Sequence, residues 1–317
     1  MKSTLPQSIE LPMRDGVSAS CVQVPVGEWS SLLAFLCAQF PVIEEVIWRS
    51  RFARGLVLDQ TGNVAQPTDS CKTGSRVYYY REVLQEIEIP FHETILYQDS
   101  HILVADKPHF LPVIPSGIYV QQTLLTRLKR ATGIGHLSPL HRIDKDTAGL
   151  VMFSVNPKTR NAYQSLFRTQ QVTKHYQAVA RWNNTLQYPI SHRSRLVEDA
   201  QFFRTQEVVG TENSETFVNV LAQNSDSALY DLQPLTGKKH QLRVHMASLG
   251  MAIANDVLYP VVQERAAENF TCPLQLLARS LAFVDPVTHE PRYFESQRML
   301  ADATRFATAA STDCATA

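Results

Sequence analysis

Residues 139–156 read PLHRIDKDTAGLVMFSVN, and this stretch joins a dense polar cluster to a near-continuous apolar run. The cluster, residues 141–146, contains an imidazole, a guanidinium and two carboxylates. The apolar run that begins at Ala148 is typical of a strand that is buried on both faces. We therefore expect a buried strand with charged side chains gathered at its entrance.

Asp144 is the residue of this cluster that is best suited to chemistry. Because Arg142 lies close to it in the chain, we expect the carboxylate to stay ionised at neutral pH. An ionised carboxylate can act as a nucleophile or as a base. A surface turn with satisfied charges would have the same composition, so the cluster alone leaves both interpretations open.

Two further segments carry candidate functional residues. In the segment VTKHYQAV, Lys174 and Tyr176 would share one face of a strand, where a phenol beside an ammonium can stack on a base and pass a proton. In the segment TGKKHQLRVH, Lys239 and Arg243 would face one way at the i and i+4 positions of a helix. An exposed cross-strand pair and a solvated basic turn are the respective alternatives.

The remainder of the chain alternates between strand and helix patterns without the strict order of βαβ units. Strands are expected within residues 56–64, 75–84, 93–108, 172–180, 214–223 and 228–235. Helices are expected within residues 29–54, where Pro41 should break the run, and within 123–132, 157–171 with Pro157 at its start, and 240–250. This mixture favours an α+β fold on a largely antiparallel sheet.

We expect three parts along the chain. Residues 1–90 should form a small N-terminal α/β accessory module, which opens with an irregular arm over residues 1–28. Residues 91–300 should form the main domain. Residues 301–317 are small and polar, so we expect them to form a flexible tail.

The composition limits the classes of protein to which the chain can belong. It has 317 residues, of which 44% are hydrophobic, enough for a large core and too many for a disordered chain. No stretch approaches the roughly 18 apolar residues of a membrane-spanning helix, and the first residues lack the apolar segment of a secretory signal. The five cysteines are scattered without a CxxC pair, which favours free thiols in a reducing compartment. We therefore expect a cytoplasmic protein.

The charges are balanced overall, with 30 Lys and Arg against 30 Asp and Glu, but they are unevenly distributed. Residues 1–100 have 8 Lys and Arg against 12 Asp and Glu, a net charge of −4. Residues 127–174 have 9 Lys and Arg against only Asp144 and Asp146, a net charge of +7. A basic stretch around two acids suits a site for a polyanion, and a solvated helix face is the alternative.

Common cofactor motifs are absent from the sequence. It has neither GxxxxGK[ST] nor GxGxxG, so binding of a nucleoside triphosphate or a dinucleotide is unsupported. Its histidines show no HExxH or similar ligand spacing, so we expect no metal site.

Taken together, these segments resemble the RluA family of pseudouridine synthases. HRIDKDTAGL is similar to the family's HRLD-x-x-[TS]-[SA]-GL signature, VTKHYQAV to its K-x-Y strand, and TGKKHQLRVH to its TGR-x-HQ-[IL]-RVH segment. ILVADKP before them and NDVLY after them resemble its entry strand and its GD-x-x-Y turn. Ile143, Lys238 and Leu277 stand where Leu, Arg and His are usual. The ordered set spans about residues 91–296 and is far more specific than any one motif.

The resemblance implies a fold, a reaction and a set of roles. The fold is a mixed, mainly antiparallel central sheet with flanking helices, and the reaction converts uridine in RNA to pseudouridine without a cofactor or a metal. Asp144 matches the family's essential Asp, which attacks the sugar or removes its proton. Tyr176 matches the Tyr that stacks on the uracil and is proposed to take the proton from the ring carbon. Arg243 matches the Arg that pairs with the Asp.

A second group of residues is expected to contact the RNA, namely His141, Arg142, Lys174, Lys239 and His240. The substrate would be structured RNA, either rRNA or tRNA, with the target uridine turned out of its stack. We expect the protein to act as a monomer. Two alternatives stay open: a non-catalytic RNA-binding protein that keeps the fold, and a carboxylate-dependent glycosidase in which Asp146 is the second acid.

Residues 29–80 resemble, in a degenerate form, the alpha-L RNA-binding module that many members of that family carry. They share its order of two helices, with Arg49, Arg51 and Arg54 on the second, followed by short strands. The usual V-x-V-N-G hairpin is replaced by LVLDQTGNV, and the region is net acidic. RNA binding and a docking or structural role are both open for this module.

Overall fold

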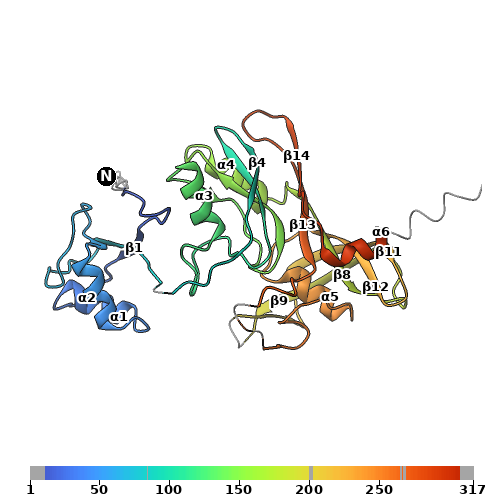
Figure 1. Ribbon diagram of the computed structural model, residues 1–317, viewed down its shortest axis with the longest axis horizontal. Coiled ribbons are helices and arrows are strands. Elements are labelled where there is room, and N and C mark those ends of the chain that lie inside the picture. Colours follow the sequence, from blue (N-terminus) through green and yellow to red (C-terminus); the bar gives the residue numbers. More distant parts are fainter. Residues whose placement is uncertain (1–10, 84, 200–202, 265, 267–268, 308–317) are drawn as a thin grey trace, which may run out of the picture. The chain divides into compact units, whose positions relative to one another are not determined.

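The computed structural model describes residues 11–83, 85–199, 203–264, 266 and 269–307 (Figure 1). The chain divides into two compact units. Unit 1 takes in residues 1–86, 116–121 and 126–135, and unit 2 takes in residues 87–115, 122–125 and 136–317. The boundary near residue 90 between an accessory module and a main domain stays a prediction.

Unit 2 is built on a mixed sheet of 11 strands. The strands are β4 (Thr94–Gln98), β5 (Ile102–Lys107), β6 (Ser138–Pro139), β7 (Ala148–Ser154), β8 (Thr173–Arg181), β9 (Ile190–Glu198), β10 (Thr205–Val208), β11 (Ser214–Gln223), β12 (Ser227–Pro234), β13 (Leu276–Val284) and β14 (Pro291–Glu295). Their order is β10-β9-β11-β12-β8-β13-β7-β5-β4, with β14 paired to β13 and β6 to β7. Every pairing is antiparallel except that of β13 with β7. The expected α+β fold with a mixed, mainly antiparallel sheet is confirmed.

The buried strand at the end of the polar cluster is β7. All of its residues are buried, and it lies between β5 and β13 in the sheet. Gly149 has a φ of +107°, and a Cβ there would overlap the carbonyl oxygen of Ala278 on β13 and stand 2.7 Å from its nitrogen. Only glycine fits this backbone and this close approach. The glycine after the polar cluster therefore allows the close approach of β7 to β13.

The helices expected in the second half of the chain are present. Helix α4 (Arg160–Arg168) begins later than expected, because Pro157 and the two residues after it form a turn. Helix α5 (Gln241–Ser248) is followed by Gly250 with a φ of +73°, the left-handed conformation that commonly ends a helix. Helix α3 (Leu124–Thr132) also forms as expected, and the division between the two units passes through it.

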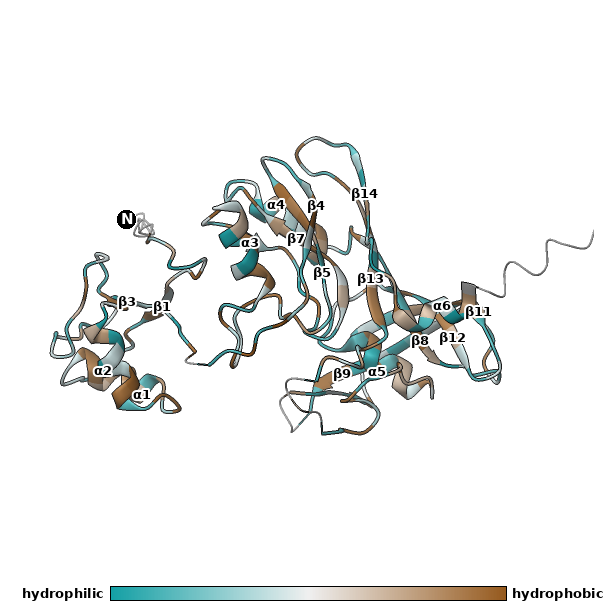
Figure 2. Cartoon of the chain, viewed as in Figure 1, coloured by the Kyte–Doolittle hydropathy of each residue, from teal (hydrophilic) through white to brown (hydrophobic). Residues whose placement is uncertain are grey.

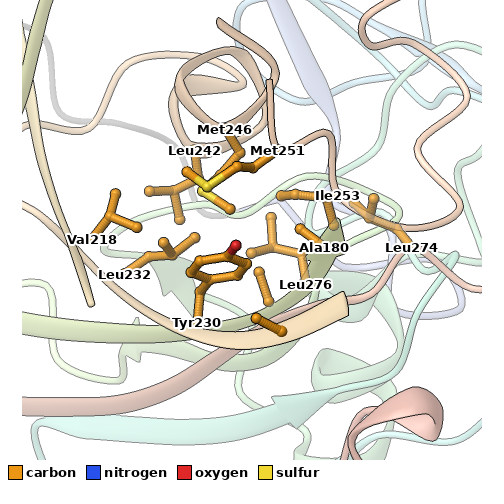
Figure 3. Packing of buried hydrophobic residues seen from close by; sticks show 12 residues of the cluster. Ala180, Val218, Tyr230, Leu232, Leu242, Met246, Met251, Ile253, Leu274 and Leu276 are labelled. Atoms are coloured by element: carbon orange, nitrogen blue, oxygen red, sulfur yellow. The ribbon is translucent and has the colours of Figure 1, made fainter. Parts of the chain in front are cut away.

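A hydrophobic cluster lies between α5 and the sheet (Figure 3). Its buried residues are Ala178, Ala180, Val218, Ala228, Tyr230, Leu232, Leu242, Met246, Met251, Ile253, Leu274 and Leu276. Figure 3 shows Leu242 and Met246 of α5 on one side of the cluster and Tyr230 and Leu232 of β12 on the other. Tyr176 of β8 packs against the same cluster. Helix α5 and strand β8 therefore rest on one shared core.

Unit 1 contains two helices and a small sheet. Helices α1 (Leu32–Gln39) and α2 (Glu45–Ala53) lie on either side of Pro41 in the chain, as expected. Helix α1 is largely apolar (Figure 2), and four of its eight residues are buried. The sheet has the order β1-β3-β2, with β2 (Val57–Leu58) and β3 (Arg76–Tyr79) inside two expected strand ranges.

The N-terminal arm is less irregular than expected. Strand β1 (Ser20–Gln23) forms within it and pairs antiparallel with β3, so the prediction of an irregular arm is wrong there. The pairing partner lies more than 50 residues away in the chain, which is why the local pattern did not reveal it. Residues 1–10 of the arm lie outside the described part of the chain.

Strands β9 and β10 were not expected from the sequence. The inward positions of β9 include His192 and Ser194 as well as Leu196, so its alternation is hidden in a hydropathy pattern. These strands extend one end of the sheet beyond β11.

The start of the expected flexible tail is ordered. Residues Ala301–Ala303 form the 3-10 helix η1 and Thr304–Ala307 form α6. The prediction is wrong for these seven residues, because Phe306 is buried in a cluster with Leu300 and Leu277. Residues 308–317 lie outside the described part. Among the residues that the structure describes, no helix has the length and hydropathy needed to cross a membrane.

Candidate active site

Residues from three separate sequence segments meet in one pocket of unit 2. The pocket is formed by the loop before β7, by β8, by the loop from β12 to α5 and by the start of α5. Six of the eight candidates named from the sequence line it, namely Arg142, Asp144, Lys174, Tyr176, His240 and Arg243. Asp144 is the single carboxylate among the described residues that line this pocket.

Asp144 lies against two nitrogen-bearing side chains. Its Oδ2 atom is 3.4 Å from Nη1 of Arg243, and its Oδ1 atom is 3.9 Å from Nε2 of His240. The Asp144 side chain is 27% exposed, whereas that of Arg243 is 2% exposed. The carboxylate is therefore partly exposed to solvent, whereas the guanidinium behind it is buried.

The main partner of Arg243 is Asp256 rather than Asp144. Arg243 donates from Nε to Oδ2 of Asp256 at 2.8 Å and from Nη2 to Oδ1 at 2.7 Å, a bidentate pair in which both groups are buried. Burial alone would lower the pKa of Arg243, but the bonds to Asp256 and the charge of Asp144 raise it above its ordinary value. Arg243 thus stays cationic and presents its remaining Nη1 to Asp144.

Asp256 is itself held in place by the backbone. Its Oδ1 atom accepts hydrogen bonds from the amide nitrogens of Leu258 at 2.8 Å and Tyr259 at 3.1 Å. The Tyr259 ring lies 5.4 Å from the Arg243 guanidinium carbon, within the range of a cation–π contact. The NDVLY turn therefore serves as the anchor of Arg243.

Tyr176 forms an aromatic wall of the pocket. Burial, together with the negative charge of Asp144, raises the pKa of its phenol above the ordinary value, so the phenol is neutral at neutral pH. The ring packs on the hydrophobic cluster between α5 and the sheet, which limits its movement. A rigid, neutral aromatic ring beside a carboxylate can hold a flat base against that carboxylate.

The remaining charged residues of the lining are mainly basic. Lys174 donates from Nζ to the backbone oxygen of Thr236 at 3.2 Å, and burial lowers its pKa to about 8. Arg142 is exposed, and Lys238 lines the pocket from the loop before α5. These cations around one acid give the pocket the charge that a phosphate backbone requires.

His240 stands at the start of α5 in the left-handed conformation, with a φ of 56°. Its Nδ1 lies 3.0 Å from the Tyr259 hydroxyl. Burial lowers the pKa of His240 although Asp144 acts in the opposite sense, so the imidazole is largely neutral at neutral pH. Because the helix begins only at Gln241, Lys239 is not on it, and the expected i, i+4 pair of Lys239 and Arg243 is wrong.

Comparison with known proteins shows the family of the chain. The family model described as RNA pseudouridylate synthase matches residues 101–248. The dual-specificity RNA pseudouridine synthase RluA of Pasteurella multocida is 30% identical over 200 residues, 62% of this chain and 89% of that protein. The chain belongs to the RluA family of RNA pseudouridine synthases. It is an isomerase that converts uridine in RNA to pseudouridine.

Other relatives of this synthase cover a similar share of the chain. An uncharacterised RNA pseudouridine synthase of Synechocystis is 26% identical over 72% of this chain and 79% of that protein. The solved structure of human RNA pseudouridylate synthase domain containing 4 matches with a TM-score of 0.51 and 26% identity, over 65% of this chain and 88% of that one. The solved structure of the human domain containing 1 matches with a TM-score of 0.55 and 21% identity, over 68% of this chain and 86% of that one, and shows the same fold.

Two candidates of the synthase lie outside the pocket lining. His141 accepts a hydrogen bond at Nε2 from the Met152 amide at 3.1 Å and stacks on Phe167 with ring centroids 4.6 Å apart. Burial lowers its pKa to about 3, so it is neutral and holds the loop against β7. Lys239 is exposed beside the pocket. Neither His141 nor Lys239 is therefore placed to contact a base that is bound in the pocket.

Two supporting residues of the synthase were not named as site residues from the sequence. Gln241 accepts from the Thr236 hydroxyl at 2.7 Å and from the Lys238 amide at 3.1 Å, which fixes the loop before α5. Lys107 is fully buried and donates from Nζ to the backbone oxygens of Pro108 at 2.9 Å and Lys145 at 3.0 Å. Burial lowers the pKa of Lys107 to about 7. Both residues lie in the motifs quoted from the sequence, but the spacing of those motifs does not predict these contacts.

Proposed function

We propose that Asp144 is the group that initiates the isomerisation, by attacking the ribose or by removing a proton from it. Its place as the one carboxylate among the described lining residues carries this proposal. The cationic Arg243 beside it pairs with the carboxylate and orients it.

Tyr176 serves mainly as a platform for the uracil ring. The bond between the ribose and N1 of the base must break, the base must turn, and a bond from the ribose to C5 must form while C5 loses its proton. A base that rotates while detached needs a flat, unreactive surface, and a neutral phenol packed on a rigid core supplies one. Removal of the C5 proton by Tyr176 would require the phenol to give up its own proton first.

The substrate that we propose is structured RNA, either rRNA or tRNA. Arg142, Lys174 and Lys238 would contact phosphates near the target uridine. A uridine inside a helical stack cannot reach Asp144, so the base must be turned out into the pocket, which loops allow at low cost. We further propose that the synthase acts as a monomer in the cytoplasm.

The experiment that tests this assignment compares two carboxylates of one loop. Purified wild type, Asp144→Asn and Asp146→Asn proteins are incubated with transcripts that carry tritium at C5 of uridine, and release of tritium to water is measured. We expect Asp144→Asn to reduce the rate at least about 1,000-fold with RNA affinity nearly unchanged, because the reacting group is lost and the phosphate contacts remain. Asp146→Asn should keep most of the rate, since Asp146 does not line the pocket.

The natural target is found by mapping pseudouridine in total RNA from cells with and without the gene. A site that disappears on deletion and returns with the wild-type gene, but not with the Asp144→Asn gene, identifies the substrate and supports the assignment. A purified Asp144→Asn protein that keeps the wild-type rate would refute it.

A further inference from the structure

A second cluster of chemically active side chains lies in the same unit, among residues that do not line the active-site pocket. His192 on β9, Glu207 on β10 and His245 on α5 place their ligating atoms within 4.8 Å of one another. His192 Nε2 is 3.0 Å from Glu207 Oε2. The imidazole rings of His192 and His245 lie edge to face, with centroids 4.7 Å apart.

We propose that these three side chains bind a divalent transition metal ion, with zinc as the expected occupant. Two imidazoles and one carboxylate form a ligand set that suits Zn²⁺, which takes four ligands in a tetrahedron. Water would fill the fourth position, because Glu207 and His192 are 29% and 18% exposed and open the site to solvent. The hard ions Mg²⁺ and Ca²⁺ prefer all-oxygen sites and do not match this set.

The present spacing is close to what zinc requires. Zinc–nitrogen and zinc–oxygen distances of about 2.0–2.2 Å place neighbouring ligands of a tetrahedron about 3.3 Å apart. The His192–Glu207 separation of 3.0 Å already lies near this value. The wider separations, at most 4.8 Å, must close by about 1.5 Å. Rotation of the partly exposed Glu207 and His192 side chains supplies this movement, so the buried His245 can stay in place.

Contacts with hydroxyl groups hold the His245 imidazole in place. Its Nδ1 lies 2.9 Å from the Thr216 hydroxyl, the kind of partner that orients a metal-bound imidazole. Its Nε2 lies 3.0 Å and 3.1 Å from the hydroxyls of Ser194 and Ser214. A metal ion bound at Nε2 would take the place of these two hydroxyl contacts.

The ion would join three elements that are otherwise linked by hydrogen bonds and packing. Strands β9 and β10 extend one end of the sheet, and α5 carries Arg243 only two residues before His245. A metal bridge would hold the β9–β10 pair to the helix that positions the catalytic arginine. The proposed role is structural, since none of the three ligands lines the active-site pocket.

The competing interpretation is an ordinary ion pair of His192 with Glu207 beside a satisfied buried histidine. The two interpretations differ in one measurable respect, which is a metal affinity that needs both His192 and Glu207. The pair of His175 with Asp231 offers a matched control, since it is also an imidazole–carboxylate contact of 3.0 Å on a strand.

The test uses the full-length protein after removal of metal with a chelator. Zn²⁺ binding is measured by calorimetry, and Co²⁺ binding by visible absorption, for wild type, His192→Gln, Glu207→Gln and the control His175→Gln. We expect one ion per wild-type and control chain, with at least about tenfold weaker binding in the other two variants. The Co²⁺ spectrum should lack the near-ultraviolet thiolate band that cysteine ligands would produce. Circular dichroism checks that each variant is folded, which the partial exposure of His192 and Glu207 favours.

Three results would overturn the proposal. They are absence of Zn²⁺ binding by the wild type at micromolar concentrations, unchanged affinity in either His192→Gln or Glu207→Gln, and a thiolate band in the Co²⁺ complex. None of them bears on the isomerase activity, so the outcome is independent of the assignment of Asp144.

Discussion

Asp256→Asn tests whether a buried ion pair behind the pocket holds Arg243 in place. The substitution keeps the shape of the side chain and removes its charge. In the native protein, Arg243 and Asp256 are 2% and 1% exposed and are joined by two bonds of 2.7 and 2.8 Å. Removing one partner of a buried ion pair destabilises a protein by about 3–5 kcal/mol, because the other charge is left uncompensated. Asp144 at 3.4 Å offsets part of that charge, so we expect the lower end, about 3 kcal/mol.

The stability is measured by urea unfolding, with circular dichroism as the signal, and by thermal unfolding. A loss of about 3 kcal/mol corresponds to a fall in Tm of roughly 6–12 °C for a protein of this size. The matched control is Asp302→Asn, which removes the partner of the mostly exposed Arg305 and should change the free energy of unfolding by less than about 1 kcal/mol. We also expect the isomerisation rate to fall at least about tenfold, since a released Arg243 is no longer held in its position beside Asp144. A loss below about 1 kcal/mol with an unchanged rate would show that Asp256 is not the anchor of Arg243.

Three further outcomes are expected. Tyr176→Phe should keep RNA affinity within about threefold, because the ring still stacks. An unchanged rate in the tritium-release assay would limit Tyr176 to the role of a platform, and loss of the rate with RNA binding intact would assign proton transfer to its phenol. Gly149→Ala should lower the free energy of unfolding by at least about 2 kcal/mol through backbone strain and overlap with Ala278, whereas Gly237→Ala, whose Cβ would meet open space, should change it by less than about 0.5 kcal/mol. Lys174, with its pKa of about 8, is cationic below that pH and neutral above it, so RNA affinity measured by filter binding should fall from pH 7 to pH 9. The Lys174→Arg protein should not show this fall, and an identical fall in both proteins would assign it to another group.

Much of the fold could be predicted from local pattern. Several elements lie near the places where local pattern predicted them. They are β7 with its continuous apolar run, β8 and β12 with their alternation, and the helices on either side of Pro41. Such features depend on the period and the backbone preferences of a few adjacent residues. Strand β1 and helix α6 were not predicted, because both depend on partners that are distant in the chain. Strand β1 pairs with β3, and Phe306 of α6 packs with Leu277.

In the candidate site, too, local motifs could be predicted and contacts between distant residues could not. The ordered motifs identified Asp144, Tyr176 and Arg243, and folding brings all three into one pocket. They did not identify the buried bond from Arg243 to Asp256, because the geometry of a salt bridge depends on burial and not on spacing. The predicted alignment of Lys239 with Arg243 does not form, because His240 between them takes the left-handed conformation and the helix begins after it.

The sequence by itself determined the class of fold, the family, the reaction and most of the candidate residues that line the pocket, because each depends on residue types and short spacings. Only the tertiary structure decided how Arg243 is anchored, that burial raises the pKa of the Tyr176 phenol, and that His192, Glu207 and His245 meet. These properties arise from contacts between elements far apart in the chain and from the water that packing removes. Neither these contacts nor the exclusion of water exists until the chain has folded.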